Sequence, residues 1–316
     1  MDRVVVRAPA HLHAGNFDLT GDLGRLYGTV GFAIDYQLEI SVEKSDFIAS
    51  NDMWAKHYAE ALVKRLGVKG VKVDVRKKIP AFAGLGYNTT LALSIGVAIS
   101  KLYDLGLRVE DVALTVRRGL ITALGVYAFK FGGFIVEGGF KVNLKEKMLP
   151  PLIFRVDVPE NWLFVVALPE KPLSKVREIR EREDVVLESL EQMPSSLSDA
   201  LSRIVLVKVI PSIIERDLDS FGEGLTLFNL KLGEFWSRYQ GGVYCHPIVE
   251  EGVKIMLRRS KCACQSSWGP TFYSIVEGEA RAKELVEELR AFLNANGGGE
   301  VFYVKADNDG AEVLED

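Results

Sequence analysis

A glycine-rich loop that opens an apolar helix is the feature that most constrains this chain. Residues 84–90 read GLGYNTT and follow a strand-like run that stops at Pro80. Glycines let the backbone approach an anion closely, and the N–H groups at a helix start favour negative charge. Thr89 or Thr90 can cap the helix or contact a phosphate. The loop therefore predicts a phosphate-binding site, with an ordinary capped turn as the alternative.

Charge and composition exclude several classes of function. The 316 residues carry a net charge of −4, which argues against a general affinity for nucleic acid. The first residues lack the apolar region of a signal peptide, and polar residues break the apolar stretches well short of a membrane span. We therefore expect a cytoplasmic protein that binds neither nucleic acid nor membrane and is long enough for two domains.

Apolar periodicity predicts a mixture of strands and helices. Residues 3–8 and 31–43 predict strands, and the stretch between His11 and Gly31 is expected to be rich in turns. One helix is predicted to end at Gly67, and another to follow the glycine-rich loop. Strands alternate with helix pairs in the second half, which favours a ferredoxin-like α+β layer. The tail over residues 307–316 is expected to fray.

A polar loop in the second half is another candidate site. Residues 265–271 read QSSWGPT and place hydroxyl groups, an amide and an indole beside a predicted strand. Such groups can orient a sugar phosphate or an aromatic ring. A serine- and glycine-containing turn with an anchored tryptophan explains the same composition, so both interpretations stay open.

Charged and imidazole side chains gather near the N-terminus. Arg25 could hold a phosphate through two parallel hydrogen bonds, and His13 could transfer a proton or simply donate a hydrogen bond. A histidine near a strand end is more often a structural residue. The whole group comprises His11, His13, Asp18, Asp22 and Arg25.

Three further groups have both a structural and a functional interpretation. The arginine pair at 117–118 ends a predicted helix and can simply complement its dipole. Glu137 lies in a strand between two glycine pairs, where it could ligate magnesium or pair with a lysine. Cys262 and Cys264, with the Cys245-His246 pair, offer a possible zinc set, but the spacing of Cys262 and Cys264 is unusual for structural zinc. Free buried thiols in a reducing compartment are therefore expected.

Taken in chain order, these motifs resemble the GHMP kinase superfamily over nearly the whole chain. The more specific resemblance is to a non-kinase branch, the archaeal β-ribofuranosylaminobenzene 5′-phosphate synthases. The motifs that carry it are Leu12-His13, Gly24-Arg25-Leu26-Tyr27-Gly28 with Gly31, Gly84-Leu85-Gly86, GGFIVEGG at 132–139, and Gln265 to Thr271. The resemblance implies a two-domain α+β fold of the GHMP type. A ribosomal-S5-domain-2-like unit would cover residues 1–157, and a ferredoxin-like unit would cover 158–316.

One position separates the synthases from the kinases. Kinases of the superfamily commonly carry a catalytic aspartate shortly before the glycine pair at 132–133, and here that place holds Gly125. The synthases also lack this acid. The resemblance therefore implies a pentosyltransferase that joins phosphoribosyl pyrophosphate to a para-substituted benzoate. Pyrophosphate and carbon dioxide would be released, in the biosynthesis of methanopterin-type cofactors.

The resemblance also implies roles for individual residues. Arg25 would neutralise the phosphates, His13 would orient the substrate, and Glu137 would assist a magnesium ion, with no organic cofactor expected. The phosphate-binding set comprises Gly84, Gly86, Asn88, Thr89 and Thr90. The substrate-binding set comprises Gln265, Ser266, Ser267, Trp268 and Thr271. The helix-rich second half is compatible with a homodimer.

Departures from the family pattern leave other functions open. The family loop reads closer to GLGSGT, whereas this chain has Tyr87 and Asn88 at the small pair and Phe82 where a histidine precedes the loop. Tyr87 is expected to narrow the space above the helix start. The run EKPLSKVREI at 170–179 is also more charged than the family's loop there. Two alternatives remain: an ATP-dependent small-molecule kinase, and a non-catalytic nucleotide- or metabolite-binding protein on the same fold.

Overall fold

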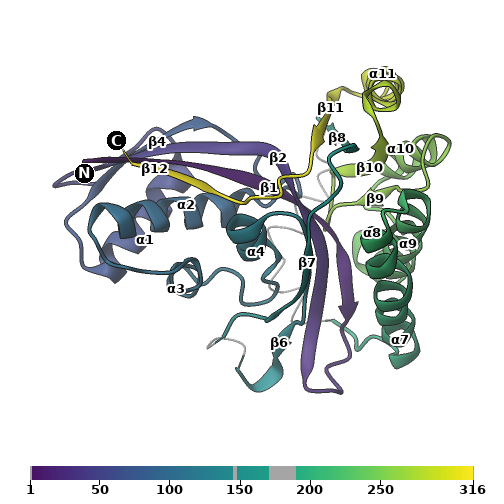
Figure 1. Ribbon diagram of the computed structural model, residues 1–316, viewed down its shortest axis with the longest axis horizontal. Helices are drawn as coiled ribbons and strands as arrows, with labels where there is room; N and C mark the ends of the chain where they lie inside the picture. Colours follow the sequence, from purple (N-terminus) through teal and green to yellow (C-terminus); the bar gives the residue numbers. More distant parts are fainter. Residues whose placement is uncertain (1, 145–147, 171–189, 316) are drawn as a thin grey trace.

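Two largely antiparallel sheets organise the protein, the first built mainly from the first half of the chain and the second from the second half (Figure 1). The computed structural model describes residues 2–144, 148–170 and 190–315. The first sheet has the order β12-β1-β2-β4-β3, with β5 and β6 paired to β2 and β7 paired to β5. The second sheet has the order β11-β8-β10-β9. Most of the charged run at 170–179 lies outside the described residues.

The first sheet is built on two long strands. Its members are β1 (Arg3–Asp18), β2 (Arg25–Lys44), β3 (Ala49–Ser50), β4 (Val71–Lys77), β5 (Phe134–Glu137), β6 (Phe140–Lys141), β7 (Leu152–Val156) and β12 (Glu312–Glu315). The prediction that the stretch between His11 and Gly31 is rich in turns is therefore wrong, because β1 and β2 cover most of it. Its glycines serve close packing instead: a Cβ at Gly15 would lie 2.5 Å from the Leu232 side chain, and one at Gly28 would lie 2.1 Å from the Phe17 ring.

The C-terminal tail is ordered, so the expectation that it frays is wrong. Strand β12 pairs antiparallel with β1, with Val313 opposite Val6 and Leu314 opposite Val5. The pairing satisfies the backbone groups along an edge of β1 that would otherwise lack a partner strand. The last strand therefore belongs to the sheet of the first half, across the boundary expected at residue 157.

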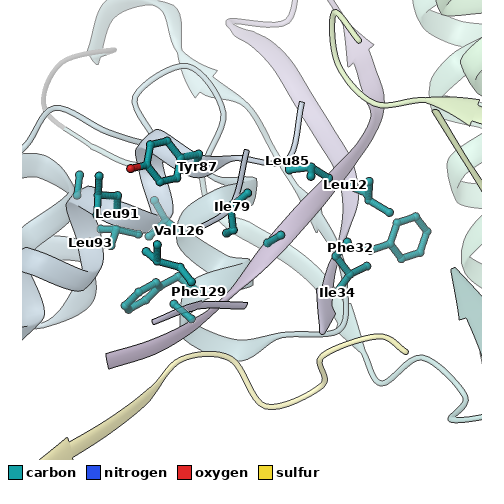
Figure 2. Packing of buried hydrophobic residues seen from close by; sticks show 14 of the residues in the cluster. Leu12, Phe32, Ile34, Ile79, Leu85, Tyr87, Leu91, Leu93, Val126 and Phe129 are labelled. Atoms are coloured by element: carbon teal, nitrogen blue, oxygen red, sulfur yellow. The ribbon is translucent and has the colours of Figure 1, made fainter. Parts of the chain in front are cut away.

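Helices cover one face of the first sheet (Figure 1). They are α1 (Met53–Leu66), α2 (Tyr87–Leu102), α3 (Val109–Thr115) and α4 (Leu124–Phe131), followed by a 3₁₀ turn, η1 (Val142–Leu144). Helix α1 ends as predicted at Gly67, whose left-handed conformation closes the helix. Helix α2 is buried on nearly all sides, and Figure 2 shows its Leu91 and Leu93 packed near Val126 and Phe129 of α4. The glycine-rich loop is thus fixed to a helix inside the core.

The second half forms a ferredoxin-like layer, as predicted. Its strands are β8 (Trp162–Pro169), β9 (Cys264–Gln265), β10 (Phe272–Glu277) and β11 (Gly299–Lys305). Its helices are α7 (Ser195–Ile204), a π-helical turn η2 (Val205–Val209), α8 (Ile210–Glu215), α9 (Leu218–Gln240), α10 (Pro247–Leu257) and α11 (Glu279–Ala295). Helices α7 to α10 lie between β8 and β9 along the chain, and α11 lies between β10 and β11, which gives the β-α-β-β-α-β order. Cys245, Cys262 and Cys264 are buried and none of them forms a disulfide. Within the described ranges, no helix combines the length and apolarity needed to cross a membrane.

An aromatic cluster joins the two halves into one core. Phe32 of β2 lies 5.2 Å from Phe134 of β5 and 5.1 Å from Phe164 of β8, measured between ring centroids. Phe221 of α9 and Tyr273 of β10 contact the same Phe32 ring, at 6.0 and 6.3 Å. Rings at these separations pack tightly and stabilise their relative positions. Residues of both halves can therefore form one site with fixed geometry.

Glu137 is a carboxyl group buried within the first sheet. Its side chain has no exposed surface, and its Oε2 accepts a hydrogen bond of 2.7 Å from the Gly139 N–H. Burial raises the pKa of Glu137 to about 7, although the Thr29 hydroxyl and the Gly139 N–H oppose the rise. The folded protein therefore holds this proton more tightly than the unfolded chain does.

This shift predicts a loss of stability as the pH rises. Between the ordinary carboxyl pKa and about 7 the folded state binds more protons, so the free energy of unfolding should fall by about 2 kcal/mol from pH 5 to pH 8 on account of Glu137. The Glu137→Gln variant should lack this component in denaturant titrations at several pH values. A Glu43→Gln variant, changed at an exposed position of β2, should follow the wild type. Equal pH dependence in all three proteins would contradict the assignment.

Candidate functional site

The glycine-rich loop ends in a glycine that begins helix α2. Gly86 is the N-cap, with a left-handed φ of 77°, and makes no side-chain capping hydrogen bond. The Thr89 N–H donates to the Gly86 carbonyl at 3.1 Å, so the Tyr87 and Asn88 N–H groups are the ones that can receive an anion. A Cβ at Gly86 would lie 1.9 Å from the His11 ring, so only glycine fits here. Tyr87 packs into the core with 3% of its surface exposed (Figure 2) and lines a hollow of about 100 Å³ on the glycine-rich loop, so the expectation that it narrows the space there stays a prediction.

The polar loop of the second half holds this glycine-rich loop in place through hydrogen bonds. The Ser266 hydroxyl donates to the Gly84 carbonyl at 2.7 Å, and the Thr271 hydroxyl donates to the Ala83 carbonyl. Ser266 also accepts a hydrogen bond of 3.0 Å from the His13 backbone N–H. Both hydroxyl-bearing residues are fully buried. Ser266 and Thr271 therefore join β1, the glycine-rich loop and the second sheet at one point.

A cavity of about 610 Å³ lies where these elements meet. The first half contributes the end of β1, the glycine-rich loop and the segment after α3, and the second half contributes α9 and the loop before β10. The cavity receives several of the residues predicted from the sequence. These are His13, Gly84, Gly86, Thr89, Gln265, Ser267 and Trp268.

The cavity wall is basic although the whole chain is acidic. Arg117 and Arg118 line it together with His11 and His13, and among the described lining residues none is Asp or Glu. The Arg118 guanidinium hydrogen-bonds the Tyr58 hydroxyl and lies 5.4 Å from that ring's centroid, which restricts its orientation. Burial lowers the pKa of His11 to about 4, so this imidazole is neutral at pH 7. Such a wall favours an anionic ligand.

One face of helix α9 also lines the cavity. Trp236 stands edge-on to Trp268 with 4.6 Å between ring centroids, and the two indoles form an apolar surface. Asn229 holds the neighbouring backbone, because its Nδ2 donates to the carbonyls of Ala14 and Gln265 at 2.8 and 3.0 Å. The Gln265 amide is in turn fixed, since its Nε2 donates to Gln240 Oε1 at 3.1 Å. This wall can hold a flat apolar ring with polar groups at its rim.

Six of the predicted site residues are not among the described residues that line the cavity. Ser266 and Thr271 hydrogen-bond the carbonyls of the glycine-rich loop. Thr90 is buried, and its hydroxyl donates to the Pro9 carbonyl at 3.3 Å. Asn88 lines a separate hollow of about 100 Å³ on the glycine-rich loop. The Arg25 guanidinium donates to the Gly139 carbonyl at 2.9 Å, beside β6. Glu137 is enclosed in the sheet.

The magnesium site expected at Glu137 stays a prediction. Magnesium is commonly held by one or two carboxylates together with waters and substrate phosphates, whereas Glu137 is enclosed away from the cavity. Across the described ranges, no group of three or more His, Cys, Asp or Glu side chains could hold a metal ion. Glu137 Oε2 is also occupied by the Gly139 N–H.

Several cavity residues were not predicted from the sequence. On α9, the positions of Asn229, Leu232, Gly233, Trp236 and Gln240 follow the helical period, and all five line the cavity. That spacing also describes a helix face buried in a core, so the sequence offers no means to distinguish the two. Asn16, which donates to the Thr29 hydroxyl at 3.0 Å, lay in the stretch expected to form turns.

Curated relatives cover the whole chain. The β-ribofuranosylphenol 5′-phosphate synthase of Archaeoglobus fulgidus is 29% identical over 98% of this chain and 98% of its own length. The enzyme of the same name from Methanocaldococcus jannaschii is 26% identical over 98% of this chain and 100% of its own length.

Solved structures show the same fold. A mevalonate kinase from L. major, crystallised with R-mevalonate, superposes with a TM-score of 0.70 at 14% identity, covering 95% of each chain. The family models for the GHMP kinases N terminal domain and the GHMP kinases C terminal domain match residues 54–133 and 209–295. Together these two matches span more than half of the sequence and include the glycine-rich loop, the arginine pair and the cavity face of α9. The chain therefore belongs to the GHMP kinase superfamily.

Proposed function

We propose that this protein is a pentosyltransferase that joins phosphoribosyl pyrophosphate to para-hydroxybenzoate, with release of pyrophosphate and carbon dioxide. The observation that carries the proposal is a single cavity that combines a glycine-rich helix start and two arginines with a wall of two indoles. The names of the curated relatives refer to a ribofuranosylphenol phosphate. A phenol product corresponds to the hydroxyl rather than the amino analogue of the aromatic acid.

The basic part of the cavity suits the phosphorylated substrate. The start of α2 offers N–H groups and the positive end of the helix dipole. Arg117 and Arg118 add positive charge from the segment after α3. A guanidinium holds phosphate oxygens through paired hydrogen bonds, which also stabilise negative charge as it develops on a departing pyrophosphate.

The indole wall suits the aromatic substrate. Trp236 and Trp268 can pack against a benzoate ring, and the fixed amides of Gln240 and Gln265 can contact its polar groups. A ring held in this way has few orientations, so its reacting carbon can be kept against the ribose. Placing both substrates in one cavity of about 610 Å³ removes most of the entropic barrier to their meeting.

The proposed reaction balances without an external oxidant or reductant. The ring carbon that bears the carboxylate uses a π electron pair to form a bond to ribose C1. The bond from C1 to the pyrophosphate oxygen breaks, and its electron pair leaves with pyrophosphate. The bond from the ring to the carboxylate then breaks, and its electron pair restores the aromatic ring as carbon dioxide departs.

A kinase reaction is less consistent with the site. The place where superfamily kinases carry an aspartate is Gly125, and a Cβ added there would lie 2.6 Å from the His11 ring. An acidic side chain at this position would displace the imidazole. A kinase would therefore need another base, and no Asp or Glu lies among the described lining residues.

A release assay tests the proposal. Carboxyl-labelled para-hydroxybenzoate, phosphoribosyl pyrophosphate and Mg²⁺ should yield labelled carbon dioxide with the wild-type protein. Release should require both organic substrates, and ATP should not replace phosphoribosyl pyrophosphate. Consumption of ATP with a metabolite alcohol would support the kinase alternative. Binding of phosphoribosyl pyrophosphate without release of labelled carbon dioxide would support the alternative of a non-catalytic binding protein.

The arginine wall leads to a second prediction. The Arg118→Ala variant should raise the KM for phosphoribosyl pyrophosphate by about tenfold or more, because it removes a charge-assisted hydrogen bond. The KM for the aromatic acid should change much less. Arg281→Ala, which removes an exposed arginine on α11, serves as the matched control and should behave like the wild type. An unchanged KM in Arg118→Ala would remove this residue from the site.

A further inference from the structure

His11 is a cavity residue that the proposed reaction has not yet used. It lies on β1, where its backbone N–H donates to the Leu85 carbonyl at 3.2 Å. Its ring packs directly against Gly86, the first residue of the α2 cap, and lines the main cavity. The ring is therefore placed beside the N–H groups that would receive an anion.

The His11 ring packs against two glycines, where any side chain would collide with it. A Cβ at Gly86 would lie 1.9 Å from His11 Cε1, and a Cβ at Gly125 would lie 2.6 Å from the same atom. Gly125 lies in helix α4, where φ is not left-handed, so backbone freedom does not explain the absence of a side chain there. The imidazole from β1 thus occupies the space that a residue-125 side chain from α4 would enter.

The surroundings of the ring indicate which nitrogen meets a ligand. His11 Nδ1 is enclosed and has no hydrogen-bond partner in the described part of the chain. A buried N–H without an acceptor is rarer in proteins than a buried lone pair without a donor. These frequencies favour the tautomer in which Nδ1 is unprotonated and Nε2 carries the hydrogen. Burial lowers the pKa of His11 to about 4, which keeps this neutral form at pH 7 in the free protein.

We propose that His11 is a further substrate-binding residue, whose Nε2–H donates a hydrogen bond to a phosphate oxygen held at the start of α2. The ring occupies the place where the resemblance to superfamily kinases implies an acidic side chain, and it is a neutral donor rather than a negative group. A donor suits a phosphate-bearing ligand, whereas a carboxylate at this place would repel one. The inference rests on the proposed function only for the identity of the phosphorylated substrate.

Titration calorimetry with inorganic pyrophosphate tests the contact without any need for turnover. His11→Ala should weaken binding by about tenfold, the usual effect of losing one hydrogen bond to a charged group. In His11→Gln the side-chain amide nitrogen can reach the Nε2 position, so most of the affinity should return. In His11→Asn the amide reaches only the Nδ1 position, and binding should resemble that of His11→Ala. His57→Ala, changed at an exposed histidine of α1, is the matched control.

The outcomes separate this inference from the proposed function. Unchanged pyrophosphate affinity in a folded His11→Ala protein would overturn it, as would rescue by asparagine but not by glutamine. Absence of pyrophosphate binding by the wild type would also overturn it. If pyrophosphate binding depends on His11 but no labelled carbon dioxide is released, the proposed function fails and the contact stands.

A double-mutant cycle tests the shared space independently of any ligand. Gly125→Asp alone should lower the melting temperature, because its Cβ would collide with the His11 ring. In the His11→Ala background the same substitution should cause a much smaller loss. Additive changes in melting temperature would show that the two positions do not compete for space, and would overturn this part of the argument.

Discussion

The site depends on hydrogen bonds between two loops that are far apart in the sequence. Ser266 and Thr271 donate their hydroxyl hydrogens to the Gly84 and Ala83 carbonyls, and Ser266 also receives the His13 N–H. These groups are enclosed, where an unpaired polar atom would destabilise the fold. The glycine-rich loop is thus held by the second half of the chain, and the cavity forms only when both sheets share the aromatic core.

Close packing explains why glycines recur around the cavity. Gly86 and Gly125 accommodate the His11 ring, and Gly15 accommodates side chains of α9. The same crowding brings backbone N–H groups, an imidazole and two arginines to one wall. A chain with a net charge of −4 thereby presents a basic surface to its ligand. Local arrangement, rather than total charge, sets the electrostatic character of a binding site.

Sequence patterns identified both loops but not what each residue does in them. The hydroxyls of Ser266 and Thr271 have the chemistry of a sugar-phosphate site, yet the structure uses them to bind backbone carbonyls. The glycines between His11 and Gly31 have the composition of turns, yet they lie mostly in two long strands. Composition records which groups are available and leaves their partners open, since a partner can lie anywhere in the chain.

The sequence by itself determined the helix start with its open N–H groups, the ferredoxin-like order of the second half and the membership of the superfamily. These follow from local periodicity and from short motifs, which act over a few residues. Only the tertiary structure decided that His11 occupies the space beside Gly125 and that Trp236 faces Trp268. The tertiary structure also decided that β12 pairs with β1 in the first sheet and that Glu137 is buried away from the cavity. These features depend on contacts between distant segments, and no local pattern encodes such contacts.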